Sequence, residues 1–220
     1  MKICVVTDKR KQFSVRLPAC DFALFGFGAL GVVDYESELE GRSEKFEQVA
    51  KLSRAARCGV LCGCITDSRG LLRKSVAVAS GGKLLGISDM LNVFDGEEYK
   101  SGAVLGIYSV GGYKVGLCID NDLYFPDLIK TCATCGCNLV AVHAEEVSDG
   151  IPPLLIRAYA YLYGMPVVLC AGGTAYFADI NGVLASSNQD VAVFETSPKN
   201  CYRLVTSRRR GLFTPEVEDF

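Results

Sequence analysis

The chain has 220 residues, of which 50% are hydrophobic, and a formal net charge of −2 at neutral pH. This length and balance predict one compact domain over residues 1–220 with a large core, and they argue against nucleic acid as a partner. No apolar run reaches the roughly 18 residues that a membrane-spanning helix needs, and the apolar start is too short for a signal peptide. We therefore expect a cytoplasmic protein that binds no membrane.

Short apolar segments alternate with a few helical ones, a pattern typical of an α/β or α+β sandwich. The expected strands are Lys2–Thr7, Phe22–Phe27, Val60–Thr66, Ser75–Ala79, Lys83–Ile87, Val104–Tyr108, Tyr113–Ile119, Leu139–His143, Val167–Ala171, Ala175–Ala178 and Val191–Glu195. So many strands require at least two sheets. Three pairs mark tight hairpins, because their turns need positive φ: Gly81-Gly82, Gly111-Gly112 and Asn181-Gly182.

Two segments have the apolar period of a helix. The first is Ser43 to Arg57, with Ser43 as the expected N-cap, and the second is Ile151 to Gly164, with prolines at its start and glycine at its end. A third helix is expected from Pro126 onwards, because proline suits the first turn of a helix. These helices would cover the outer faces of two stacked sheets.

The eleven cysteines lie mostly inside apolar segments, so we expect small buried thiols rather than a disulfide framework. Two groups could form a metal site: Cys58, Cys62 and Cys64, and Cys132, Cys135 and Cys137. A structural metal site needs four ligands with close pairs in loops, whereas these residues alternate along a strand or lie on a helix. Core packing is favoured, and neither a metal nor another cofactor is expected.

The segment Val115 to Asp127 indicates a strand, a sharp turn and a helix. An apolar strand runs into Asp120-Asn121-Asp122, and then into Phe125-Pro126-Asp127. A turn of this kind presents one side chain at the C-terminal edge of a sheet, next to the free N–H groups of a helix N-terminus. Such a position suits a nucleophile or an anion.

This segment is similar to the nucleophile motif of the nitrilase, or carbon–nitrogen hydrolase, superfamily, Gly-x-x-x-Cys-x-Asp-x-x-Phe-Pro-Glu. The motif places its glycine at Gly116, its aspartate at Asp122 and its nucleophilic cysteine at Asp120. Further stretches that resemble the family are residues 74–86, 97–102, 137–142, 173–185 and 208–213. The resemblance implies a single-domain, four-layer α-β-β-α sandwich, with the segment Asp8 to Pro18 in place of a longer first helix.

The resemblance also implies a homodimer that pairs through the helices after the elbow and the late strands, with the tail 207–220 crossing over. The family's chemistry needs a cysteine nucleophile, a glutamate base and a lysine that stabilises the oxyanion. The equivalent positions here are Asp120, Phe27 and Met90, and none of these side chains can replace the lost group. A further glutamate of the family matches Glu97 or Glu98.

We therefore expect a catalytically degenerate relative that binds a small ligand or has a structural or regulatory role. A pocket lined by Phe27, Met90, Asp120 and His143 would be apolar apart from the aspartate, so an amine-bearing ligand is conceivable. The alternative is an active amidase or nitrilase-type hydrolase that uses atypical residues.

Three side chains carry rival interpretations. Cys118 is either a substitute nucleophile or a buried core thiol, and the second is favoured because two residues along a strand place it about 6.6 Å too deep. Asp120 is either a nucleophile or general base, or a cap for the following helix. His143, the single histidine, either lines the pocket or is a hydrogen-bonded core residue, and a catalytic role is less favoured.

Overall fold

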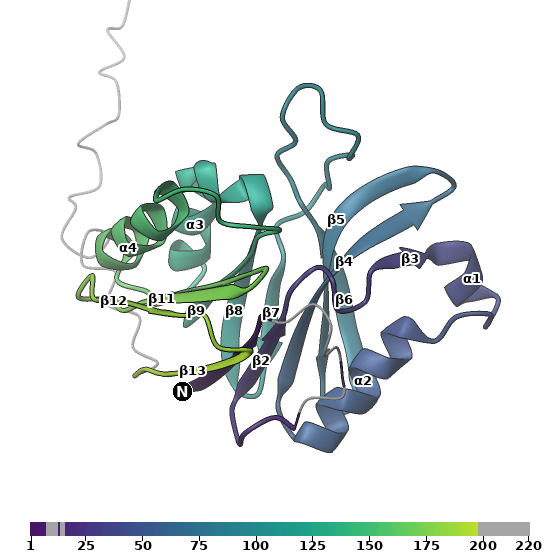
Figure 1. Ribbon diagram of the computed structural model, residues 1–220, viewed down its shortest axis with the longest axis horizontal. Helices are drawn as coiled ribbons and strands as arrows, with labels where there is room; N and C mark the ends of the chain where they lie inside the picture. Colours follow the sequence, from purple (N-terminus) through teal and green to yellow (C-terminus); the bar gives the residue numbers. More distant parts are fainter. Residues whose placement is uncertain (8–12, 14–15, 198–220) are drawn as a thin grey trace, which may run out of the picture.

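The computed structural model describes residues 1–7, 13 and 16–197 as two β-sheets packed face to face between layers of helices (Figure 1). Helix α2 (Lys45–Ala56) covers the outer face of one sheet, and helices α3 (Pro126–Thr134) and α4 (Ile151–Tyr163) cover the outer face of the other. The predicted α-β-β-α sandwich is confirmed. Most of the segment Asp8 to Pro18 and the whole tail 207–220 lie outside the described residues.

The first sheet has the order β13-β1-β2-β4-β5-β6, with β3 beside β4. Its parallel centre pairs β1 with β2 and β2 with β4, and the hairpins β4–β5 and β5–β6 are antiparallel. The strand bounds are β1 Lys2–Val6, β2 Phe22–Phe25, β3 Val32–Asp34, β4 Gly59–Ser68, β5 Leu71–Ser80, β6 Lys83–Asp89 and β13 Val191–Glu195.

The second sheet has the order β12-β11-β10-β9-β8-β7. Strands β8, β9 and β10 are parallel to one another, and the remaining pairs are antiparallel. The strand bounds are β7 Ile107–Val110, β8 Tyr113–Ile119, β9 Leu139–His143, β10 Val167–Ala171, β11 Thr174–Ala178 and β12 Leu184–Ser187.

The main core fills the space between the sheets, and strand alternation decides which side chains enter it. On β5, Val76 and Val78 belong to this inter-sheet core, whereas Ala77 and Ala79 pack under α2. Because side chains alternate along a strand, Lys74 shares the inward face of Val76 and Val78. A lysine therefore points toward the opposite sheet at one end of the sandwich.

The predicted helices are present, with one correction at a helix start. Helix α4 ends at Gly164, which has φ +59°, as its sequence indicated. Ser43 is not the N-cap of α2, which is Glu44 without a side-chain cap bond. The Glu38 carboxylate instead accepts from the backbone N–H of Lys45 at 2.9 Å and from the Ser43 hydroxyl. Glu38 lies on the short helix α1 (Tyr35–Leu39), which the sequence pattern did not predict.

The strands differ from the expectation mainly at edges. Strands β3 and β12 were not predicted, and β5 begins at Leu71 rather than at Ser75. The hairpin turns at Gly81-Gly82 and Gly111-Gly112 are confirmed, and all four glycines have positive φ. Among the described residues, no helix is long and apolar enough to cross a membrane.

Candidate functional site

The predicted elbow is present at the end of β8. The strand ends at Ile119, a 3-10 turn covers Asp120 to Tyr124, and α3 begins with Pro126. Asp120 has φ +50°, in the left-handed region, which glycine adopts readily and which only short polar residues such as asparagine and aspartate adopt at moderate cost. Such a conformation costs about 1–3 kcal/mol and persists only where the surroundings hold it, and it is common at functional sites.

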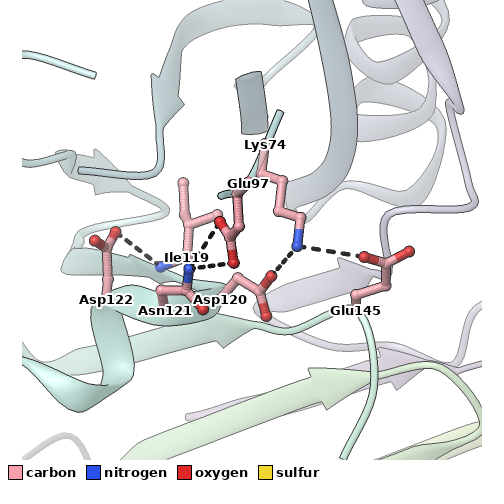
Figure 2. Close-up of polar contacts among 7 residues, drawn as sticks. All are labelled: Lys74, Glu97, Ile119, Asp120, Asn121, Asp122 and Glu145. Atoms are coloured by element: carbon pink, nitrogen blue, oxygen red, sulfur yellow. Dashed lines mark hydrogen bonds and ion pairs between the residues drawn. The ribbon is translucent and has the colours of Figure 1, made fainter. Parts of the chain in front are cut away.

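The surroundings hold Asp120 through Lys74, a residue that the sequence pattern did not select. The Lys74 ammonium group donates a hydrogen bond to the Asp120 carboxylate and forms an ion pair with it, and it lies 3.3 Å from the Glu145 carboxylate (Figure 2). The same ammonium group lies 4.8 Å from the centre of the Tyr99 ring, a cation–π contact. Lys74 comes from the first sheet and Asp120 from the second, so the pair closes one end of the sandwich.

The ion pair between Lys74 and Asp120 is largely buried. The side chain of Lys74 is 8% exposed and that of Asp120 is 18% exposed, whereas Glu145 is 54% exposed. Burial alone would lower the pKa of Lys74, but the bonds and charges of Asp120 and Glu145 outweigh it and raise the pKa above its ordinary value. Lys74 is therefore a charged, nearly enclosed cation whose partners are carboxylates.

Two further polar residues of the elbow turn contact loops across the site. Asn121 donates its amide to both carboxylate oxygens of Glu97, at 2.9 and 3.0 Å (Figure 2). Asp122 is buried and accepts from the backbone N–H groups of Leu91, Asn92 and Ile119. Burial raises the pKa of Asp122, although these bonds oppose the shift. Glu97 thus contacts the residue next to Asp120, and Asp122 ties the elbow to the loop after β6.

Met90 and Phe27 lie in the inter-sheet core and not at a polar surface. Met90 is fully buried, and its backbone N–H donates to the Lys74 carbonyl at 2.8 Å, so the two residues are neighbours across β5 and β6. Phe27 is 8% exposed and belongs to the same core cluster. The cavity beside Phe27 has a volume of about 10 Å³, about enough for one water molecule.

Cys118 and His143 are both buried, on opposite faces of the second sheet. Cys118 lies in the cluster under α3 and α4, and burial raises the pKa of its thiol well above the ordinary value. His143 pairs with Ile119 across β9 and β8, and its Nε2 lies 3.4 Å from the Leu61 carbonyl oxygen of the first sheet. Burial lowers the pKa of His143 to about 4, so the ring is neutral. This geometry fits the interpretation of His143 as a hydrogen-bonded core residue.

The cysteines of the described segments are free thiols, and none of them groups with other ligands into a cluster of three or more that could hold a metal ion. Cys62 and Cys64 are buried under α2 on alternate positions of β4. Cys132, on the buried face of α3, and Cys137 belong to the core cluster of the second sheet, and Cys135, the C-cap residue of α3, is exposed.

No family model matches the chain, and no curated protein matches it in sequence. Similarity appears in solved structures of an amidase from Nesterenkonia sp. AN1. One has a TM-score of 0.73 at 15% identity and covers 95% of this chain and 96% of its own, and a mutant of that amidase, described as from the nitrilase superfamily, has a TM-score of 0.71 at 16% identity over 88% of each chain.

A further mutant of that amidase, in which acrylamide has undergone Michael addition at the active-site cysteine, has a TM-score of 0.70 at 15% identity and covers 90% of this chain and 93% of its own. The similarity therefore runs over almost the whole length of both proteins, with little sequence in common. This chain has the fold of the nitrilase-superfamily amidases, with an aspartate at the elbow and a lysine from β5 against it.

Proposed function

We propose that this chain is a nitrilase-fold protein without cysteine-dependent hydrolase chemistry, acting as a small-ligand-binding or regulatory protein. The observation that carries the proposal is the ion pair between Lys74 and Asp120 at the elbow. An attacking group must reach its substrate carbon and be free of competing partners. Asp120 is instead bound to an enclosed cation, and Cys118 is a protonated thiol on the far face of its strand.

The charge of the site favours a ligand with an amino group. The Lys74 ammonium group contacts two carboxylates, those of Asp120 and Glu145, and a third carboxylate, that of Glu97, contacts Asn121 of the same turn. Glu145 is more than half exposed, so its carboxylate is available to a molecule from solution. An excess of negative charge at a partly enclosed site attracts cations and repels anions. We therefore propose a primary amine or diamine as the ligand class.

The first experiment measures ammonia release from a panel of aliphatic amides and nitriles. We expect none above that of a heat-inactivated sample. Release that is proportional to protein concentration, and that is lost in Cys118→Ala or Asp120→Asn, would refute the proposal. Binding is measured by calorimetry with putrescine and, as a matched uncharged control, butanediol. Binding heat from putrescine and none from butanediol supports an amine as the ligand class. Binding of putrescine to Glu145→Gln with unchanged affinity contradicts the proposal.

A second candidate, an active hydrolase of a non-peptide C–N bond with atypical residues, is favoured by one observation. A carboxylate with a strained backbone lies against a lysine, and a carboxylate can act as a nucleophile in hydrolases. This candidate predicts that Asp120→Asn and Lys74→Met each abolish ammonia release, whereas Cys118→Ala retains it. The same panel of amides distinguishes the two candidates.

We also propose a homodimer that pairs through α4. Leu154, Ala158 and Tyr161 share one face of this helix, and Leu154 and Tyr161 are 58% and 66% exposed. Val183, in the neighbouring turn, is exposed as well, and a groove of about 390 Å³ runs between the helix and this turn. Contiguous exposed apolar side chains mark interaction surfaces, and a two-fold axis would pair this face with itself.

Light scattering after size exclusion tests the dimer. We expect Tyr161→Glu to give a monomer, because it would bury an unpaired charge in the interface. The control is Leu39→Glu, at a more exposed leucine on α1, which should stay dimeric. A monomeric parent protein would overturn the proposal. The free thiols of the described residues suit a reducing compartment, so we propose a cytoplasmic location.

A further inference from the structure

Cys20 and Cys58 lie at the end of the first sheet away from the elbow, and Cys4, on β1, belongs to the core cluster beneath them. Cys20 precedes β2 and Cys58 precedes β4, whereas Lys74 pairs with Ile65 near the other end of β4. Six residues of strand separate Gly59 from Ile65, which corresponds to about 20 Å. The cysteine cluster is therefore a separate feature of the molecule from the Lys74–Asp120 site.

The backbone brings the three thiols together. The Gly59 N–H donates to the Asp21 carbonyl at 2.9 Å, and the Asp21 N–H donates to the Lys2 carbonyl at 2.8 Å, so the starts of β1, β2 and β4 are held side by side. Cys4 and Cys58 belong to the cluster under α2, and Cys20 packs against it. Cys20 interacts with both Cys4 and Cys58, and each interaction shifts the pKa values of the two thiols in opposite directions.

The cluster opens into a pocket of about 400 Å³. Cys20 and Cys58 line this pocket together with Arg54 and Arg57 at the end of α2, and Cys4 does not line it. The volume lies within the range of about 300–1,000 Å³ that is usual for small-molecule sites. Two arginines line the pocket against one acidic residue, Asp21, and this balance suits a small molecule that carries carboxylates, because arginine binds carboxylates in a bidentate manner.

The local chemistry favours a reactive Cys20. The hydrogen bonds from Cys4 and Cys58 lower the pKa of Cys20 below its ordinary value, against the opposing effect of burial, and the charge of Lys2 lowers it further. The charge of Asp21 acts in the other direction. The thiolate is the nucleophilic form of cysteine, and reactive cysteines are partly exposed in electropositive surroundings. Cys20 is partly exposed and meets this description.

We propose that Cys20 and Cys58 form a redox-active dithiol that reacts with a small carboxylate-bearing disulfide, such as oxidised glutathione, bound between Arg54 and Arg57. The Cys20 thiolate attacks one sulfur of the disulfide, the S–S bond breaks, and one glutathione thiolate leaves. Cys58 then loses its proton to solvent and attacks the Cys20 sulfur, and the second glutathione thiolate leaves. The protein dithiol is oxidised by two electrons, and the disulfide is reduced to two thiols.

The geometry allows the final bond. Neighbouring strands lie about 4.8 Å apart, and disulfides join residues whose Cα atoms are about 4.4–6.8 Å apart. Cys20 lies two residues before β2 and Cys58 one residue before β4, and continuing the register that pairs Phe22 with Gly59 puts Cys58 opposite Asp21, the residue after Cys20. Cys58 is preferred to Cys4 as the second thiol because Cys58 lines the pocket, whereas Cys4 is fully buried.

The first test needs no variant. The reduced full chain is treated with oxidised glutathione at neutral pH, quenched at intervals and mapped by mass spectrometry without reduction. We expect modification at Cys20 to be roughly tenfold faster than at the exposed Cys135, because Cys20 is the better thiolate. We also expect a Cys20–Cys58 disulfide as the final product. Equal rates at Cys20 and Cys135, or a final Cys20–Cys4 bond, would overturn the proposal.

Variants test the two roles separately. Cys58→Ser should stop at the mixed disulfide on Cys20, and Cys20→Ser should give neither product, with Cys135→Ser as the unaffected control. Far-UV circular dichroism checks that each variant is folded. Arg54→Ala and Arg57→Ala should slow the reaction with oxidised glutathione but not with the uncharged disulfide of mercaptoethanol. An equal loss of rate with both disulfides would refute the assignment of the arginines as the carboxylate site.

Discussion

Replacement of Lys74 by methionine tests whether the ion pair at the elbow holds the fold together. The substitution keeps the length and apolar stem of the side chain and removes the ammonium group. It leaves the carboxylate of Asp120, which is 18% exposed, without its cation, in a backbone conformation that is itself strained. Removal of one partner of a buried ion pair costs about 3–5 kcal/mol, because the other charge stays buried and unpaired.

The partial exposure of Asp120 places the expected loss near the lower value, about 3 kcal/mol. Denaturation with urea, followed by circular dichroism, gives the free energy of unfolding for the parent and the variant. The matched control is Glu145→Gln, which removes the second carboxylate on the same ammonium group. Because Glu145 is 54% exposed, its loss should cost less than about 1 kcal/mol. A cost for Lys74→Met no larger than that for Glu145→Gln would refute the reasoning.

The double variant with Asp120→Asn completes the cycle. Once the Asp120 carboxylate is gone, removal of Lys74 no longer leaves a buried charge unpaired at this position. The losses in free energy of unfolding of the two single variants should therefore not add. We expect a coupling energy of about 1.5–3 kcal/mol for residues in direct contact. Because the pKa of Lys74 is raised in the folded protein, the contribution of its charge to stability is complete at neutral pH. It is lost as the pH rises through that pKa, above 10.5. The difference in stability between the parent and Lys74→Met should therefore shrink in alkali.

Three further predictions concern residues around the elbow. His143 has a pKa of about 4 in the folded protein against 6.5 in the unfolded chain, so its contribution to stability should fall by about 3 kcal/mol as the pH drops from 7 to 4. In urea titrations over this pH range, His143→Leu should lack this part of the loss of stability. Parallel stability curves for the parent and the variant would contradict the prediction. Gly116→Ala should cost about 1–3 kcal/mol, because an added Cβ would lie 2.4 Å from the Cys132 sulfur, and Cys132→Ala should relieve much of this loss in the same denaturation assay. Asp122→Ala should cost about 3 kcal/mol or more by thermal and urea unfolding, because it strands several N–H donors at once, and a loss below 1 kcal/mol would show that water replaces the carboxylate.

The layers of the sandwich could be predicted because their signals are local. Glycine pairs fix the hairpins, and apolar runs of strand length separate segments with a helical period. Helix α1 was missed because its five residues include two glutamates and none is buried, so no apolar period marks it. Its role in capping α2 through Glu38 is a contact between two helices, and no pattern within either segment shows it.

The site was harder to predict because its decisive contact joins two sheets. Lys74 stands before an apolar run and resembles a solvated residue at the start of a strand. The one available signal was its register, because Lys74 shares the parity of Val76 and Val78. That signal is readable only once β5 is known to begin at Leu71, three residues before the lysine. The family resemblance puts its lysine at Met90, whereas the cation that contacts Asp120 is Lys74 on β5.

The position of that cation clarifies what the elbow can do. Met90, the residue after β6, donates its backbone N–H to the carbonyl of Lys74 on β5, so a positive charge lies next to the place where the family resemblance puts its lysine. A lysine that stabilises an oxyanion must keep an N–H group free for charge that develops on the substrate. Lys74 already contacts two carboxylates and the face of an aromatic ring. In the proposed non-hydrolytic protein, Lys74 would therefore balance the negative charge of Asp120 and stabilise its strained backbone, a structural role that a charged ligand could share.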